Sequence, residues 1–261
     1  MKKCFTINEF RSSEEILTYY YLIEKNLYQA IEIFYPYKAG EEQKLSYKRS
    51  IKDLVNCFKD LEVVCHLPFG VNETIAILSK KDHTIKLLKE AIVFASEYRV
   101  KKAVLHLGAI AENCNIRITK DVICILKELC DYAKFYDIKI AIENMPSSNE
   151  LGYSPKEIKE IIELVNKDNL GFIYDTGHGN VSEYSIDDYL DLLKDHLWHI
   201  HINDNNKTRD EHKRIGLGNV DFNYFFKKTK ESNYQGLYCS EILYSDVDDL
   251  IDYYHDLKQF E

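Results

Sequence analysis

Several features that mark other classes of protein are missing from this chain of 261 residues. No run of about 18 apolar residues occurs, which excludes a helix that spans a membrane. The first ten residues, MKKCFTINEF, have neither a long apolar run nor a small-residue cleavage site, so we expect no signal peptide. The cysteines form no CxxC pair and are odd in number, which favours reduced thiols and a cytoplasmic protein. They are Cys4, Cys57, Cys65, Cys114, Cys124, Cys130 and Cys239.

An excess of basic residues is missing too. The 34 lysines and arginines are outnumbered by 43 acidic residues, and the net charge is −9. This balance argues against a broad basic face for nucleic acid, although it leaves a local basic groove open. The chain also lacks a linker, a low-complexity run and a glycine-rich turn after its first strand. We therefore expect a single domain over residues 1–261 rather than a doubly wound open sheet.

Apolar, strand-like runs alternate with helical patterns along the whole chain. Eight runs predict strands at residues 3–10, 29–36, 62–69, 101–109, 138–145, 169–178, 196–204 and 235–243. The segments between and after them predict helices at 12–27, 45–61, 81–100, 119–137, 154–168, 185–195, 221–232 and 246–260. Ser12 or Ser13 is expected to cap the first helix, and Ser154 with Pro155 the fifth. Eight strand–helix units of parallel strands fit a closed (β/α)₈ barrel, the TIM barrel.

Histidine and carboxylate residues gather at the carboxyl ends of these strands. In a barrel of this kind, those ends all meet at one face. The third to eighth strands end in His66, His106, Glu143, Asp175, His201 and Glu241. Three further candidates, His178, Asp210 and His212, lie close behind the sixth and seventh strands. Imidazole and carboxylate groups together suit a divalent metal such as zinc, manganese or cobalt.

Each of these residues also has an ordinary interpretation as a helix cap, a turn residue or the partner of a neighbouring side chain. His199 illustrates it. It shares a strand face with His201 but lies deeper in the barrel, so we interpret it as a packed or hydrogen-bonded core histidine. The metal site is favoured because successive strand ends all carry a donor.

Two glutamates suggest a reaction. Glu143 and Glu241 would approach the mouth of the barrel from different sides and form an acid/base pair on opposite faces of a substrate. A metal between them would hold a carbonyl and a neighbouring hydroxyl and stabilise an enediolate. Lys207, Arg209 and Arg214 follow the seventh strand, where they either bind a hydroxyl, carboxylate or phosphate or are solvated loop charges.

An ordered set of short motifs resembles the xylose-isomerase-like TIM-barrel superfamily, which includes sugar phosphate isomerases and epimerases and endonuclease IV. The motifs are HLPF at 66–69, HLG at 106–108, IEN at 142–144, DTGH at 175–178, HIND at 201–204, DEH with GLG at 210–218 and SE at 240–241. The resemblance implies a shared metal site made of Glu143, Asp175, His201 and Glu241. It also implies that both glutamates act as acid and base and that His178 binds or polarises the substrate.

The similarity to endonuclease IV implies a three-zinc centre. Its five further ligands would be His66, His106, His178, Asp210 and His212. Two departures weigh against a nuclease: the first strand lacks a Gly-Ala-His-type motif, and the loop after HLPF lacks the aromatic and apolar pattern that the nuclease places into damaged DNA. The ketose 3-epimerases in turn lack the Asp-x-His motif at 210–212, so neither group matches fully.

Three hypotheses follow. The leading one is an isomerase or epimerase of a sugar or sugar phosphate that depends on a divalent metal (zinc, manganese, cobalt or magnesium). Its catalytic residues would be Glu143, Glu241 and His178, and its substrate-binding residues His66, His106 and Arg214. The second hypothesis is hydrolysis of abasic DNA at a trinuclear zinc site, and the third is a metal- or sugar-binding barrel without turnover. Nucleic acid is the less favoured partner, and a homodimer is left open.

Overall fold

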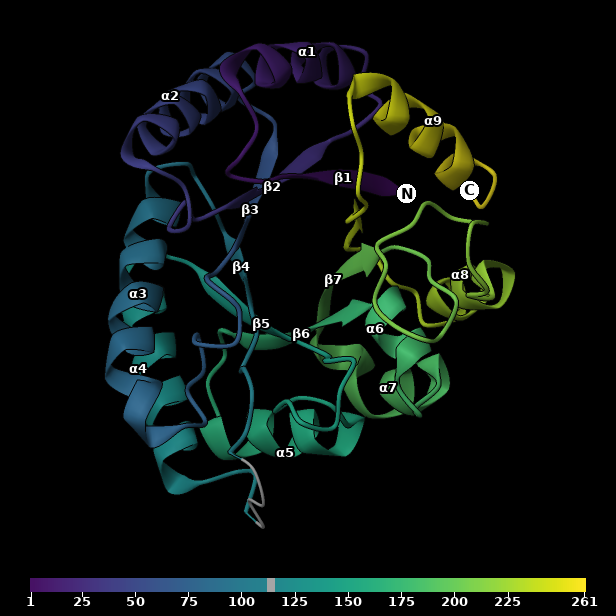
Figure 1. The fold of residues 1–261 in the computed structure, drawn as a ribbon. Coiled ribbons are helices and arrows are strands. Elements are labelled where there is room, and N and C mark those ends of the chain that lie inside the picture. Colours follow the sequence, from purple (N-terminus) through teal and green to yellow (C-terminus); the bar gives the residue numbers. More distant parts are fainter. Residues whose placement is uncertain (112–115) are drawn as a thin grey trace.

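A closed barrel of parallel strands forms the centre of the molecule (Figure 1). The computed structural model describes residues 1–111 and 116–261, and in these residues eight strands follow one another around the barrel. They are β1 Lys2–Ile7, β2 Ala30–Phe34, β3 Glu62–His66, β4 Lys102–Leu105, β5 Lys139–Glu143, β6 Leu170–Asp175, β7 Leu197–Ile202 and β8 Leu237–Ser240. β8 pairs with β1 and closes the ring. The prediction of a (β/α)₈ barrel is therefore confirmed.

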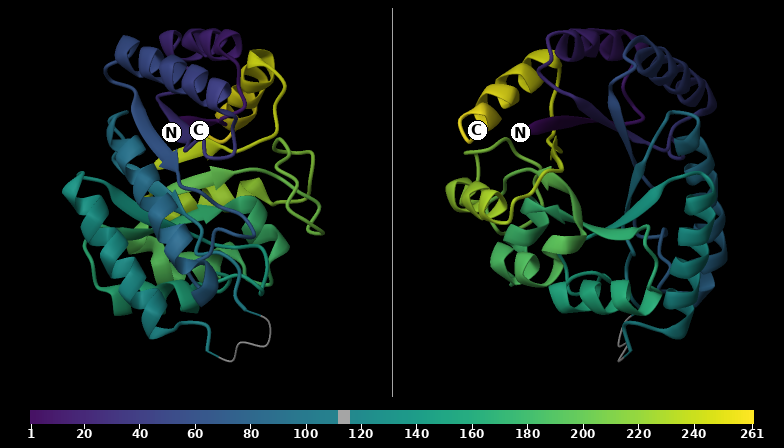
Figure 2. Two further views of the ribbon diagram at one scale, coloured as in Figure 1. Left: turned by 60° about the vertical axis from the view of Figure 1, so that its left-hand side comes forward. Right: turned by 180° about the vertical axis from the view of Figure 1, so that it is seen from behind.

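Helices surround the barrel, as the further views also show (Figure 2). In the described ranges they are α1 Ser13–Glu24, α2 Glu41–Cys57, α3 Leu78–Ser96, α4 Lys120–Phe135, α5 Pro155–Val165, α6 Thr176–Val181, α7 Ile186–Leu193, α8 Phe222–Glu231 and α9 Val247–Lys258, with a short 3₁₀ helix η1 at Lys194–His196. Each connection between consecutive strands contains a helix, which parallel pairing requires. None of the helices within these ranges has the length and apolar character needed to cross a membrane.

Capping residues explain where two helices begin. The Ser12 hydroxyl accepts a hydrogen bond from the Glu15 amide, while the Glu15 carboxylate accepts one from the Ser12 amide. This reciprocal pair is a capping box, and it fixes the start of α1. Ser154 accepts from the Glu157 amide, and Pro155 occupies the first turn of α5. Both starts agree with the sequence.

Several boundaries differ from the prediction by a few residues, and three of them have a physical reason or bear on the site. α2 begins at Glu41 rather than at residue 45, because its acidic first turn suits a helix N-terminus but shows no apolar periodicity. The first strand ends at Ile7 rather than at residue 10. The sixth strand ends at Asp175 rather than at residue 178, and the chain turns directly into α6. This helix is too short to show an apolar period, so the sequence does not predict it.

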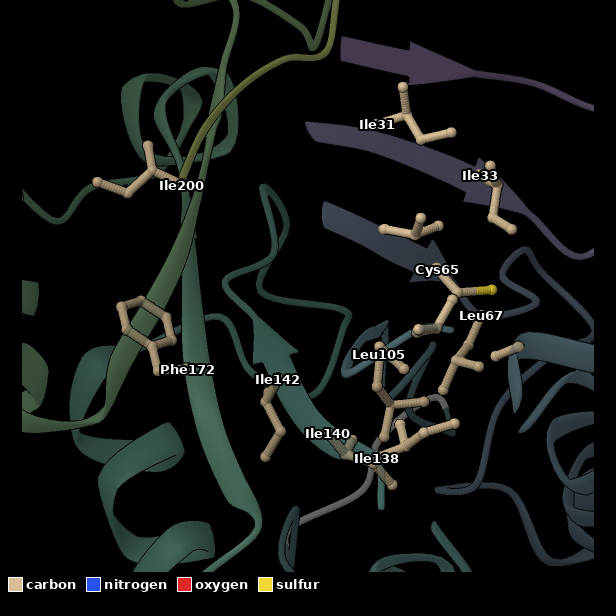
Figure 3. Close-up of a cluster of buried hydrophobic side chains, with 14 of the residues drawn as sticks. Ile31, Ile33, Cys65, Leu67, Leu105, Ile138, Ile140, Ile142, Phe172 and Ile200 are labelled. Carbon is tan, nitrogen blue, oxygen red and sulfur yellow. The ribbon is translucent and has the colours of Figure 1, made fainter. Parts of the chain in front are cut away.

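Strand side chains alternate between the surrounding helices and the barrel interior. Outward side chains such as Ile31 and Phe172 belong to the main apolar core (Figure 3). Inward side chains form a smaller apolar layer: Cys4, Ala30, Val64, Val104, Ala141, Ile173, Leu237 and Cys239. Two residues further along β3, β5 and β6 come His66, Glu143 and Asp175. The apolar layer is thus the floor beneath the polar residues at the strand ends.

The cysteines agree with the expectation of free thiols as far as the structure describes them. Six cysteines in residues 1–111 and 116–261 are free, and four of these are buried. Cys114 lies outside the described residues. Burial raises the pKa of the Cys65 thiol, which keeps it protonated and unreactive.

Candidate metal centre

The nine predicted metal ligands lie at the mouth of the barrel in three groups of donor atoms, two of which share Glu143. Within each group all donor atoms lie within 4.8 Å of one another. Ligands bound to one zinc ion at about 2.0–2.3 Å have a similar spread, so each group has the size of one metal site. The groups are named the first, second and third below.

The first donor group comprises His66, His106 and Glu143. The Nε2 atoms of the two histidines lie 3.6 and 2.8 Å from Oε2 of Glu143. Phe34 stacks on the His66 ring with the ring centroids 5.0 Å apart. Phe69 contacts both imidazoles, at 4.7 and 5.1 Å between ring centroids. The two phenylalanines therefore form an aromatic wall that restricts how the imidazoles can turn.

The second donor group comprises Glu143, Asp175, His201 and Glu241, which come from the ends of β5, β6, β7 and β8. Nδ1 of His201 lies 3.0 Å from Oε1 of Glu143 and 3.0 Å from Oε2 of Glu241. Oδ2 of Asp175 is 3.9 Å from the same nitrogen. Because the other oxygen of Glu143 faces the first group, this one carboxylate joins the two groups.

The third donor group comprises His178 on α6 and the loop residues Asp210 and His212. Oδ2 of Asp210 lies 3.4 Å from Nε2 of His178 and 2.8 Å from Nε2 of His212. Nδ1 of His178 is 3.5 Å from Oε1 of Glu143. The third group is therefore next to the other two, and all nine donors form one continuous cluster.

Two asparagines from the IEN and HIND motifs fix the position of Asp175. Oδ1 of Asn144 accepts from the Asp175 amide at 2.7 Å, and its Nδ2 donates to the Asp175 carbonyl at 3.1 Å. Nδ2 of Asn203 donates to Oδ2 of Asp175 at 2.7 Å. A Cβ at Gly177 would overlap the side-chain oxygen of Asn203, so only glycine fits there. These motif residues therefore hold the Asp175 ligand in one orientation.

The last residue of the HIND motif anchors the loop that carries two ligands of the third group. The Asp204 carboxylate accepts from the amides of Gly216, Gly218 and Val220 at 2.9, 2.9 and 3.1 Å. Its backbone also pairs with that of Lys213. One buried carboxylate thus holds the far end of the loop against the end of β7 by three hydrogen bonds.

Buried carboxylates and imidazoles shift each other's protonation. Burial opposes ionisation of Glu143, but His201 and His106 outweigh it and hold the pKa of Glu143 well below its usual range. Burial also opposes protonation of His201, but the surrounding carboxylates, Glu241 first, raise its pKa well above normal. Burial raises the pKa of Asp175 to about 7. Divalent ions can replace the protons that balance these carboxylates, so the cluster fits metal binding.

The two arginines of the loop after β7 have partners away from the donor groups. Nη1 of Arg214 lies 3.2 Å from Asp252 and its Nη2 lies 2.8 Å from Asp256, both on α9. Arg209 is largely exposed, with its Nε 3.5 Å from Glu211. The expectation that Arg214 contacts the substrate gains no support from this arrangement, because its guanidinium is held against α9.

The sequence patterns do not predict one buried carboxylate near the centre. Glu32 on β2 is 0% exposed, and its Oε2 lies 2.8 Å from Nε2 of His199. Its two oxygens lie 3.1 and 3.0 Å from Nε2 of His201. The contact confirms that His199 is a hydrogen-bonded core histidine. The signal for Glu32 is a single charge inside the apolar run AIEIF, two residues after the inward-facing Ala30.

Comparison with known proteins finds relatives along most of the chain. Uncharacterized protein MJ1311 of Methanocaldococcus jannaschii is 32% identical over 195 residues, which cover 70% of this chain and 64% of that protein. Probable endonuclease 4 of Mycoplasmopsis pulmonis is 30% identical over 186 residues, which cover 67% of this chain and 66% of that protein. The chain thus matches just under two thirds of the length of these two relatives.

Solved structures share the fold. The D-tagatose 3-epimerase-like protein has a TM-score of 0.81 and 29% identity, with 100% of this chain and 97% of that chain covered. The IolI protein with a bound zinc atom has a TM-score of 0.76 at 21% identity, covering 100% and 96% of the two chains, a likeness that shows the fold alone. The family model of xylose isomerase-like TIM barrels matches residues 23–258. Since that match takes in nearly the whole chain, the chain belongs to the xylose isomerase-like TIM-barrel family.

Proposed function

We propose that the mouth of the barrel binds three divalent metal ions, with zinc best suited to its donors, and that the protein hydrolyses a phosphoester. The position of Glu143 carries the proposal. One of its oxygens faces His106 at 2.8 Å and the other faces His201 at 3.0 Å. A carboxylate placed between two donor groups would be able to serve as a ligand in both. The third group adds a complete His-Asp-His set beside them.

The charge of the centre favours three ions over one. Four of the nine donors are carboxylates, at Glu143, Asp175, Asp210 and Glu241. Three divalent ions bring six positive charges against four negative ones, and the remaining excess suits an anionic phosphate. A single ion leaves two negative charges that protonated histidines would have to balance. Uncompensated buried charge is costly, and a bound phosphate would neutralise the excess left by three ions but not the excess left by one.

Residues around the donor groups would orient the ligands and leave one side of the centre open to substrate. Metal ions in such a cluster activate water and stabilise the negative charge that develops on a phosphoryl group. Asn144 and Asn203 keep the Asp175 ligand in one orientation. The side chains of Asp210 and His212 are 23% and 28% exposed, so the third group is where an incoming substrate would arrive. The relatives named probable endonuclease 4 support a phosphodiester as the first substrate class to test.

A second candidate is an isomerase or epimerase of a sugar or sugar phosphate. Its support is that Glu143 and Glu241 both lie 3.0 Å from Nδ1 of His201, so two carboxylates flank one position. The solved D-tagatose 3-epimerase-like protein supports the same class. In this function the two glutamates would exchange protons with the substrate. The candidate ranks second because both oxygens of Glu143 already face imidazoles, which leaves neither oxygen directed at a substrate proton.

Asp210→Asn separates the two functions. Protein purified without chelators should contain about three zinc ions per chain, and the variant about two. Cleavage of an abasic duplex and of bis(p-nitrophenyl) phosphate should fall at least about 100-fold, since losing a ligand exceeds the 10–100-fold effect of supporting residues. Asp191→Asn, an exposed position on α7, is the matched control and should behave as the unchanged protein.

An isomerase that uses the second group alone would respond differently. It would retain its turnover of a ketose or ketose phosphate in Asp210→Asn and lose it in Glu241→Gln. One ion per chain together with such turnover would contradict the hydrolase proposal. Three ions without turnover of either substrate class would point instead to a metal-binding barrel without catalysis.

A further inference from the structure

A carboxylate and an imidazole lie inside the barrel below the donor groups, and neither is a predicted metal ligand. Glu32 projects from β2 and His199 from β7, and they are 0% and 1% exposed. Glu32 is in register with the apolar Val64, and His199 with the apolar Ile173. A charged group is costly to bury beside such residues unless it is paired.

Three histidines of the centre show how such ligands are oriented. In His66, His178 and His212, Nδ1 lies 2.9, 2.8 and 2.9 Å from a backbone carbonyl oxygen. A carbonyl oxygen can only accept, so Nδ1 carries the hydrogen in each ring. Nε2 is then the atom that faces the centre and is left to bind a metal. For these ligands, the main chain alone selects the tautomer.

His201 is oriented the opposite way. Its Nδ1 faces Glu143 and Glu241, while its Nε2 points into the barrel. Inside a closed parallel barrel the strand carbonyls bond to neighbouring strands, so an acceptor for this nitrogen has to come from a side chain. Glu32 is that side chain, with its oxygens 3.1 and 3.0 Å from Nε2 of His201.

We propose that Glu32 is a positioning residue that accepts a hydrogen bond from Nε2–H of His201 and thereby presents the unprotonated Nδ1 to a metal in the second donor group. The role rests on the proposed metal centre. Glu32 acts through His201 and contacts no substrate. His199 donates from Nε2 to Oε2 of Glu32 at 2.8 Å and so holds the carboxylate in place. A carboxylate behind a ligating histidine also makes the imidazole a stronger donor.

The same residues also offer the donors of a fourth metal site. Donor atoms of Glu32, His199, His201 and Cys239 lie within 4.8 Å of one another, which is the size of a fourth metal site. That site would require Nε2 of His201 to lose its hydrogen and one imidazole to bridge two ions. The contacts of 2.8–3.1 Å between Glu32 and the two histidines are ordinary N–H···O distances, which favours the hydrogen bonds.

Glu32→Gln is the variant that tests the proposal. The amide has nearly the shape of the carboxylate but offers one acceptor oxygen and a donor, so it cannot hold both imidazoles in the same way. In a zinc titration against a chromophoric chelator, one of the three ions should bind about 10–100-fold more weakly, while the other two keep their affinity. Cys239→Ser is the matched control: it changes a neighbouring interior position, in register with His201, and should keep all three affinities.

A measurement on the unchanged protein covers the case in which Glu32→Gln does not fold. Long-range proton–nitrogen NMR spectra of the zinc-loaded protein should show His201 protonated at Nε2 and metal-bound at Nδ1. Protonation at Nδ1, or three unchanged zinc affinities in Glu32→Gln, would overturn the proposal. A fourth ion, with a cobalt–thiolate absorption band that Cys239→Ser abolishes, would also overturn it by making Glu32 a ligand.

Failure of the metal centre itself gives a different result. A wild-type protein that binds no zinc would contradict the proposed function. Spectra of the metal-free protein would still show whether Nε2 of His201 carries the hydrogen that Glu32 accepts. A metal-free His201 without that hydrogen would overturn the positioning role independently.

Discussion

The second and third donor groups reach the same mouth by different routes. The second group takes its ligands from the ends of four neighbouring strands, and Glu143, Asp175 and His201 are fully buried. The third group takes two of its three ligands from the loop after β7, and these side chains are 23% and 28% exposed. The sheet positions the strand ends, whereas a single carboxylate gathers the loop. We therefore expect the second group to be the rigid part of the centre. The third should be the separable part, which can lose its metal while the second keeps its own.

The largest effect should come from breaking the second group at the ligand it shares with the first. In Glu143→Gln, several buried imidazoles lose their charged partner. We expect zinc content to fall from about three ions to about one, since only the third group stays complete. The free energy of unfolding of the metal-free protein should fall by about 3–5 kcal/mol in a urea titration, because a buried pair is broken from one side.

Glu157→Gln is a matched control for that loss. Glu157 is a buried glutamate in the first turn of α5 that pairs with Arg117 and accepts from the Gly152 amide rather than from a donor histidine. This variant should also lose stability but keep its full zinc content. If Glu143→Gln instead retained three ions, the carboxylate could not be a bridge and the link between the first two groups would be wrong.

Metal removal should separate the rigid group from the separable one. Stepwise chelation is expected to release the ion of the third group first, because its ligands are the most exposed and sit on a loop. For each site, free zinc about 100-fold above the dissociation constant adds about 2.7 kcal/mol to stability. In a protein of this size that raises Tm by about 5–10 °C in calorimetry. Release of all ions in one step would show that the two groups are held equally firmly.

A smaller and more selective effect is expected from loosening only the loop. Asp204→Asn keeps one acceptor oxygen for the amides that the carboxylate now holds. The lost hydrogen bonds should cost about 1–3 kcal/mol, which corresponds to about 10-fold or more in zinc affinity at the third group. The second group should bind zinc as before. Equal weakening of both groups in the chelator titration would mean that the loop also supports the strand ends.

The same contrast explains what could be predicted from the sequence. The ligands at strand ends were accessible because each follows an apolar run, and parallel strands bring their carboxyl ends together. Asp210 and His212 lie in a loop with no such rule: their closeness to the seventh strand made them candidates, and the resemblance to a known motif implied that they are ligands. The role of Asp204 depends on amides more than ten residues away along the chain, which no local pattern reveals.

Two other residues show where pattern reasoning stops. Glu32 carried a signal, since a lone charge in the inward register of an apolar strand is unusual, but its partners on β7 lie across the barrel. Arg214 carried a weaker signal, because it rested only on closeness in sequence to the ligands. Its ion-pair partners come from α9, 38 and 42 residues later in the chain. Both cases depend on contacts between elements that are distant in sequence, which periodicity cannot supply.

The smallest effect is expected at Arg214, and it tests whether the third-group loop contributes a cation to the site. Arg214→Met removes two partly exposed ion pairs with α9 but keeps the apolar part of the side chain, so stability should fall by at most about 1 kcal/mol. The KM for a phosphoester should change less than about twofold, because the guanidinium faces α9 rather than the donors. A rise in KM of about 10-fold with unchanged kcat would show that the loop turns this arginine toward the substrate. The loop of the third group would then move independently of the strand ends, in addition to binding its metal independently.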